Sequence, residues 1–224
     1  MLVYFADLAH DHFKVNQYTP TGVGYLTAYS KFKLGNRVKF RLFKSVNKLL
    51  DTYEKEKPDL VGLSNYTWNI GLSKFAGSFI KKRDPSLPII MGGPNIRIDE
   101  KGIEEFLRKT EYVDTYCMFA GEFSVYEILK FLLNQPRNQR TANDLRNHIT
   151  NGCYSIYNDR LIGNSNYTRP DDLDEIPFYD YDLVDAKKYG LNPAITAYHG
   201  VTSHEKNFHF ITSLGCPFKC TFCA

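Results

Sequence analysis

The sequence contains no apolar run that approaches the roughly 18 residues needed to span a bilayer, and its mean hydropathy is -0.38. Its first residues, MLVYFADLAHDHF, lack the basic start and the small-residue cleavage site of a signal peptide. Neither charge sign dominates, because the chain has 28 basic and 25 acidic residues and therefore a formal net charge of +3. These absences predict a cytoplasmic protein without a membrane span.

A nucleic-acid partner is also disfavoured, although residues 31–48 contain seven bases and no acid. The bases alternate with Val38, Phe40 and Leu42, which is the pattern of a strand with one apolar face. Lysine commonly protects the edges of sheets. We therefore interpret this segment as a solvated edge strand.

A disulfide framework is disfavoured because the five cysteines are an odd number. Cys216, Cys220 and Cys223 lie close together, and this spacing favours a metal or redox cluster. Cys117 falls in an expected core strand and Cys153 beside an expected hairpin. We expect these last two to be structural thiols.

Five short apolar segments alternate with helix-like segments in the first 135 residues. Strands are expected at 2–6, 38–43, 59–64, 87–91 and 116–120, and helices up to residue 33 and at 46–53, 70–82, 99–109 and 123–133. This α/β alternation predicts a doubly wound, Rossmann or flavodoxin-like five-stranded parallel sheet with strand order 2-1-3-4-5. Ligands of such sheets bind beyond the carboxyl ends of the strands, where strand order reverses.

The pattern changes after residue 135. Residues 154–163, YSIYNDRLIG, predict a β-hairpin that turns at Asn158-Asp159. The acidic segment 169–185 predicts an extended linker, anchored by the aromatic residues Phe178, Tyr179 and Tyr181. A sixth strand is expected at 208–212. We therefore divide the chain into a first domain (1–135), a hairpin and linker (136–206) and the start of a second domain (207–224).

The cysteine motif CPFKCTFC at 216–223 can surround one soft metal centre with three thiolates. Zinc requires a fourth protein ligand, for which His204 and His209 are candidates. A 4Fe-4S cluster with three thiolate ligands instead leaves one iron open for a substrate or cofactor.

This CxxxCxxC motif, with Phe222 before its last cysteine, resembles that of the radical S-adenosylmethionine (radical SAM) enzymes. The resemblance implies that Cys216, Cys220 and Cys223 hold a 4Fe-4S cluster whose open iron binds S-adenosylmethionine, with Phe222 near the adenine. It implies a 5′-deoxyadenosyl radical that acts on a small-molecule substrate, with electrons from a donor such as flavodoxin or ferredoxin. Residues 207–224 then correspond to the first strand and cluster loop of a TIM-type barrel, so this chain alone is expected to be inactive.

The first 135 residues are similar to the cobalamin (vitamin B12)-binding domain that precedes this barrel in one subclass. The similarity lies in PTGVGYL (20–26), PDLVGLS (58–64), IIMGGP (89–94) and AGE (120–122). It implies methyl transfer or a radical rearrangement, with cobalamin contacts in the loops. The implied contact residues are Ser64, Tyr66, Thr67, Gly92, Gly93, Pro94, Gly121 and Glu122.

One departure concerns the DxHxxG motif of other B12 domains, whose histidine binds cobalt. This chain has Asp7-Leu-Ala-His10-Asp-His12 instead. We therefore expect cobalamin without that ligand, and His10 and His12 in a solvated loop. Two alternative hypotheses are a radical SAM enzyme whose B12-like domain binds no cobalamin, and a non-enzymatic flavodoxin-like module with a zinc or redox tail.

Overall fold

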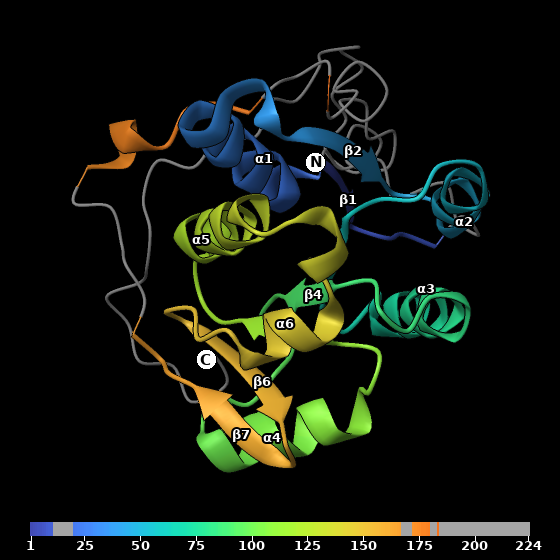
Figure 1. The fold of residues 1–224 in the computed structure, drawn as a ribbon, viewed down its shortest axis with the longest axis vertical. Helices are drawn as coiled ribbons and strands as arrows, with labels where there is room; N and C mark the ends of the chain where they lie inside the picture. Colours follow the sequence, from blue (N-terminus) through green and yellow to red (C-terminus); the bar gives the residue numbers. More distant parts are fainter. Residues whose placement is uncertain (11–19, 167–171, 180–182, 184–224) are drawn as a thin grey trace, which may run out of the picture.

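Seven strands form one sheet in the computed structural model, which describes residues 1–10, 20–166, 172–179 and 183 (Figure 1). The strands are β1 (Leu2–Ala6), β2 (Lys39–Phe43), β3 (Leu60–Ser64), β4 (Ile89–Gly92), β5 (Thr115–Cys117), β6 (Cys153–Tyr157) and β7 (Arg160–Gly163). Their order is β2-β1-β3-β4-β5-β6-β7, and β1 to β5 pair in parallel. The predicted parallel order 2-1-3-4-5 is therefore confirmed.

The predicted hairpin is confirmed, but it extends this sheet, whereas the sequence analysis assigned it to the linker. Strand β6 pairs antiparallel with β5, and β7 pairs antiparallel with β6. At the turn, Asn158 and Asp159 have positive φ angles of 47° and 60°, as a type I′ hairpin turn requires.

Six α-helices cover the two faces of the sheet among the described residues. They are α1 (Thr21–Leu34), α2 (Val46–Lys55), α3 (Ile70–Arg83), α4 (Glu100–Lys109), α5 (Gly121–Asn134) and α6 (Ala142–Asn147). One apolar cluster packs α2, α3 and α4 against the sheet, and a second packs α1, α5 and α6 against its other face. Figure 1 shows α1 next to α5, and this pair bounds the site described below.

Local sequence signals explain several boundaries. Ser45 caps α2, since its side chain accepts a hydrogen bond from the Lys48 amide, and Asp99 caps α4 through the Gly102 amide. Strand β3, LVGLS, is buried throughout because helices cover both faces of the sheet.

The short helix α6 was not predicted. Thr141 and Asp144 form a capping box at its start. Its Arg146 donates a 2.9 Å hydrogen bond to the fully buried Asp114, which also pairs with Lys81 of α3 at 2.6 Å. Buried charges are tolerated when they are paired in this way, so this ion-pair cluster ties two helices to the amino end of β5.

Strand β2 forms an edge of the sheet, as expected for the basic segment. Lys39 and Arg41 are exposed, whereas Phe40 between them is buried. No helix of the described part of the chain is long and apolar enough to cross a membrane.

The linker contacts the sheet domain through one aromatic side chain in particular. Tyr179 is 2% exposed and packs edge-on against Tyr25 of α1, with ring centroids 5.2 Å apart. Phe178 is 70% exposed, so its expected anchoring role is wrong. Tyr181, the strand expected at 208–212 and the cysteine motif lie outside the described residues.

Candidate cofactor-binding site

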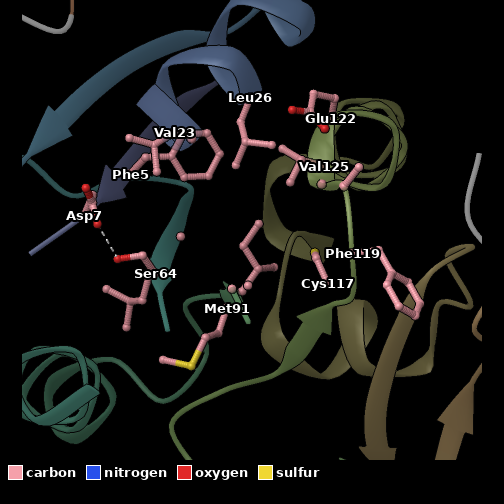
Figure 2. Close-up of a pocket in the computed structure, with 18 of the residues that line it drawn as sticks. Phe5, Asp7, Val23, Leu26, Ser64, Met91, Cys117, Phe119, Glu122 and Val125 are labelled. Atoms are coloured by element: carbon pink, nitrogen blue, oxygen red, sulfur yellow. Dashed lines mark hydrogen bonds between the residues drawn. The ribbon is translucent and has the colours of Figure 1, made fainter. Parts of the chain in front are cut away.

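A cavity of about 220 Å³ lies at the carboxyl edge of the sheet, between α1 and α5 (Figure 2). Its lining residues come from the ends of β1, β3, β4 and β5 and from the first turns of the two helices. Strand order reverses between β1 and β3, so the cavity lies where open α/β sheets bind ligands. We call it the α1–α5 cavity.

Most of the predicted loop residues meet in the α1–α5 cavity. Those that line it are Ser64, Tyr66, Gly92, Gly93, Gly121 and Glu122. Thr67 and Pro94 are exposed and do not line it. Phe222 and the three motif cysteines are outside the described residues.

The walls of the cavity are apolar. Phe5, Val23 and Leu26 lie on one side, and Val125 of α5 faces them (Figure 2). A cavity with two facing apolar walls favours binding of a flat heterocycle over binding of a sugar or an ion.

Gly22 keeps part of this space open. A Cβ built at Gly22 would meet only the Tyr66 hydroxyl, at 3.9 Å, within the 4 Å range of packing contacts. Both residues line the cavity, so a side chain at position 22 would enter it. The sequence analysis did not single out Gly22, because glycine at the start of a helix also has ordinary explanations.

Asp7 begins a hydrogen-bond network at one end of the cavity. The Ser64 hydroxyl donates a hydrogen bond to Oδ1 of Asp7 at 2.9 Å. The side-chain amide of Asn69 donates a hydrogen bond to Oγ of the same Ser64 hydroxyl at 2.7 Å. Lys44 lies 3.5 Å from the other Asp7 oxygen. This network fixes the end of β3 against the end of β1. The sequence analysis missed Asp7 as a site residue, although its position directly after a strand was a usable signal.

A second network shapes the loop after β4. The Tyr116 hydroxyl donates to the Gly93 carbonyl oxygen at 2.6 Å, and the fully buried Asn65 amide donates to Tyr116 and to the Asn95 carbonyl, both at 2.9 Å. Gly93 has a φ of +133°, and a Cβ there would lie 2.4 Å from the Asn65 carbonyl oxygen. Only glycine fits that backbone.

Two stacked rings follow β3. Tyr66 and Trp68 lie parallel, with centroids 4.5 Å apart, and Trp68 is 59% exposed. His10 is exposed, and its Nε2 lies within hydrogen-bond distance, 3.1 Å, of the Trp68 carbonyl oxygen. The expectation of an exposed loop position is thus confirmed for His10, while His12 lies outside the described residues.

The charged side chains among the residues that line the cavity are all acidic. Its lining includes Asp7 and Glu122 and no Lys, Arg or His. Burial raises the pKa of the Glu122 carboxyl, and a backbone hydrogen bond offsets only part of this effect. Such a lining favours a ligand with neutral hydrogen-bond donors and disfavours a phosphate monoester.

The described residues contain no group of three or more His, Cys, Asp or Glu side chains that could hold a metal ion. Cys117 and Cys153, expected as structural thiols, are both buried and free. The metal ligands Cys216, Cys220 and Cys223 therefore stay a prediction.

Several known proteins resemble this chain, although no protein-family model matches it. The cobalamin-dependent radical SAM methyltransferase TokK of Streptomyces tokunonensis is 24% identical over 171 residues, which cover 75% of this chain and 22% of TokK. The 2-(S-pantetheinyl)-carbapenam-3-carboxylate methyltransferase of Streptantibioticus cattleyicolor is 25% identical over 171 residues, covering 74% of this chain and 22% of that enzyme. The chain thus spans about a fifth of the length of these relatives.

Among solved structures, the cobalamin-dependent S-adenosylmethionine radical enzyme OxsB, with aqua-cobalamin and S-adenosylmethionine bound, matches with a TM-score of 0.62 and 18% identity. The match covers 82% of this chain and 25% of OxsB. It supports the Rossmann-like fold. The resemblance to cobalamin-binding radical SAM proteins, predicted from the sequence motifs, is confirmed by these relatives.

Proposed function

We propose that this chain is the cobalamin-binding part of a cobalamin-dependent radical SAM methyltransferase, with the corrinoid bound at the α1–α5 cavity. The observation that carries the proposal is the cavity itself, which lies where the strand order of the sheet reverses. It has apolar walls, two acidic side chains and a glycine, Gly22, whose missing side chain leaves space. The relatives are methyltransferases, which favours methyl transfer over a radical rearrangement.

The residues present fit cobalamin. The walls formed by Phe5, Leu26 and Val125 suit the benzimidazole of its nucleotide tail, which is flat and apolar. The carboxylates of Asp7 and Glu122 can accept hydrogen bonds from corrin amide groups.

The loops after β3, β4 and β5 would hold the corrin ring, which is too large for a cavity of about 220 Å³. In this arrangement Thr67 and Pro94 contact the ring from outside the cavity, together with Tyr66 and the backbone of Gly92, Gly93 and Gly121. When bound, cobalamin supplies a carrier for the methyl group.

No histidine of the described residues lines the cavity. His10, the one nearest in sequence to the missing DxHxxG position, lies against the Trp68 carbonyl oxygen. We therefore assign no histidine ligand of cobalt to the described part of this chain.

The remaining chemistry is assigned to Cys216, Cys220 and Cys223 as ligands of a 4Fe-4S cluster, with Phe222 near S-adenosylmethionine. Three thiolates are a suitable donor set for such a cluster. We place this enzyme in the cytoplasm, with a small-molecule substrate and an electron donor such as flavodoxin or ferredoxin. The chain alone is inactive in this proposal, since the rest of the barrel is needed for turnover.

The direct test is an equilibrium titration of the full chain with hydroxocobalamin, with flavin mononucleotide as the competing class of ligand. The proposal expects one corrinoid per chain and no flavin. Flavin binding without corrinoid would instead favour the flavodoxin-like module.

The cysteine motif is tested separately, by anaerobic reconstitution with iron and sulfide. A cluster in a chain that binds no corrinoid would indicate a radical SAM protein whose B12-like domain is a scaffold. Stoichiometric zinc without iron in protein purified anaerobically would contradict the cluster.

A further inference from the structure

Two free cysteines lie side by side in the sheet. Cys117 of β5 and Cys153 of β6 are register partners, and their sulfur atoms are 3.6 Å apart. The residues are 4% and 2% exposed, so both thiols are inside the fold.

The backbone at this pair is already spaced for a disulfide. The Met118 amide donates to the Gly152 carbonyl oxygen at 2.8 Å, one residue beyond the pair on each strand. This pattern makes Cys117 and Cys153 a non-hydrogen-bonded antiparallel pair, for which the Cα atoms are about 4.5 Å apart. Disulfides span Cα separations of about 4.4–6.8 Å, so the bond needs movement of the sulfur atoms rather than of the strands.

The two thiols are not equivalent. Cys117 lines the α1–α5 cavity (Figure 2), whereas Cys153 is not among the lining residues. The Cys153 thiol donates its hydrogen bond to the Cys117 sulfur. That hydrogen bond and burial together raise the pKa of the Cys153 thiol. Cys117 is therefore the sulfur that a small oxidant meets first.

We propose that Cys117 and Cys153 form a peroxide-reactive dithiol, in which a small peroxide enters through the α1–α5 cavity, oxidises Cys117, and Cys153 then closes a disulfide between β5 and β6. The access route favours hydrogen peroxide, which is close to water in size, over a bulky disulfide oxidant. The reaction is proposed for the chain without bound corrinoid, because the corrinoid would occupy the cavity through which the peroxide enters.

The reaction balances with one peroxide as the oxidant. The Cys117 thiolate attacks a peroxide oxygen, the S–O bond forms, the O–O bond breaks, and hydroxide leaves and is protonated to water. The Cys153 sulfur then attacks the Cys117 sulfur, the S–S bond forms, the S–O bond breaks, and a second water leaves with the proton of Cys153. Two thiols lose two electrons in total, and one peroxide becomes two waters.

The test uses the full chain, fully reduced and then treated with hydrogen peroxide. Remaining thiols are alkylated under denaturing conditions, and the digested protein is analysed by mass spectrometry. The proposal expects a linked pair of peptides that contain Cys117 and Cys153 and lack two hydrogen atoms. The thermal midpoint should also rise by on the order of 5–10 °C, because the bond closes a long loop, and the rise should reverse with reductant. If both cysteines are still alkylated, or are oxidised without a link, the proposal is wrong.

Cys153→Ser and Cys117→Ser test the order of the two steps. With Cys153 replaced, Cys117 should accumulate as a sulfenic acid that dimedone traps. With Cys117 replaced, Cys153 should give at least about tenfold less trapped product, because it does not line the cavity. Equal trapping in the two variants would overturn the assignment of Cys117 as the reacting thiol.

A background with Cys216, Cys220 and Cys223 all replaced by alanine removes competing thiols. The same link between Cys117 and Cys153 must form in this background. Its absence there would show that the link depends on exchange with the cysteine motif, and this result would also overturn the proposal.

Discussion

The hydroxyl of Tyr116 donates a 2.6 Å hydrogen bond to the carbonyl oxygen of Gly93. Tyr116 lies in β5, and Gly93 follows β4, so the bond ties the loop after one strand to the middle of the next. The Asn65 amide reaches the same hydroxyl from the end of β3. The ends of β3 and β4 are thus both tied to β5 through one buried phenol.

Replacing Tyr116 by Phe removes the hydroxyl and both of its hydrogen bonds. We expect Tyr116→Phe to lower the free energy of unfolding by about 1–3 kcal/mol, because the Asn65 amide and the Gly93 carbonyl lose a buried partner. Urea-induced unfolding measures the change.

Tyr112→Phe is the matched control. The Tyr112 hydroxyl is buried and has no hydrogen-bond partner among the described residues, and burial raises the pKa of Tyr112 to about 12. Its removal should leave the stability unchanged or raise it by up to about 1 kcal/mol. Equal losses in the two variants would contradict the role assigned to Tyr116.

Gly93→Ala tests the backbone of the same loop. The left-handed φ of Gly93 opposes a side chain, and so does the 2.4 Å distance that a Cβ would have from the Asn65 carbonyl oxygen. We expect a loss of about 2–4 kcal/mol in the free energy of unfolding. Gly71→Ala in α3 is the control, since its Cβ would meet nothing within 4 Å, and it should gain about 0.5–1 kcal/mol from helix propensity. A tolerated Gly93→Ala would mean that the loop can adopt another backbone conformation.

We expect Glu122 to make the free energy of unfolding depend on pH. Burial raises the pKa of its carboxyl in the folded chain, so protonation favours the folded state. The associated stability is fully present below the unfolded pKa of about 4.3 and is lost as the pH rises through the folded pKa. Glu122→Gln resembles the protonated form, so it should be more stable than the unmodified chain at pH 7, and this advantage should shrink towards pH 4.

The measurement is the unfolding free energy of both proteins across that pH range. Glu127→Gln, in the same helix but at an exposed position, is the control and should show no such trend. An advantage of Glu122→Gln that does not vary with pH would exclude carboxyl burial as its cause.

The parallel part of the sheet was predictable because each strand and helix carries its own periodicity, and short crossovers restrict the order of the strands. The edge position of β2 followed from the alternation of Lys39, Phe40 and Arg41. The pairing of β6 with β5 was not predictable, because alternation indicates a strand but does not identify its neighbour. Cys117 and Cys153 meet only through that pairing, so their proximity was hidden as well.

The residues of the candidate site also divide into those that local sequence indicates and those that only the tertiary structure brings together. Glycine-rich loops at strand ends indicated Gly92, Gly93 and Gly121, since such positions are local in sequence. Asp7 and Gly22 were missed, because their importance depends on β1, α1 and β3 coming together in space. Thr67 and Pro94 share the loops of the cavity residues but lie outside the cavity, and sequence spacing alone does not separate these cases.

The most direct test of the central claim, that the α1–α5 cavity binds the corrinoid, compares Gly22→Leu with Gly22→Ala. The alanine methyl would lie at an ordinary 3.9 Å from the Tyr66 hydroxyl, whereas leucine would fill the space between the apolar walls. Equilibrium titration with hydroxocobalamin should give Gly22→Ala the affinity of the unmodified chain. For Gly22→Leu we expect an affinity at least about tenfold lower, or about 1.4 kcal/mol, with an unchanged free energy of unfolding. Equal hydroxocobalamin affinity in both variants would contradict the claim.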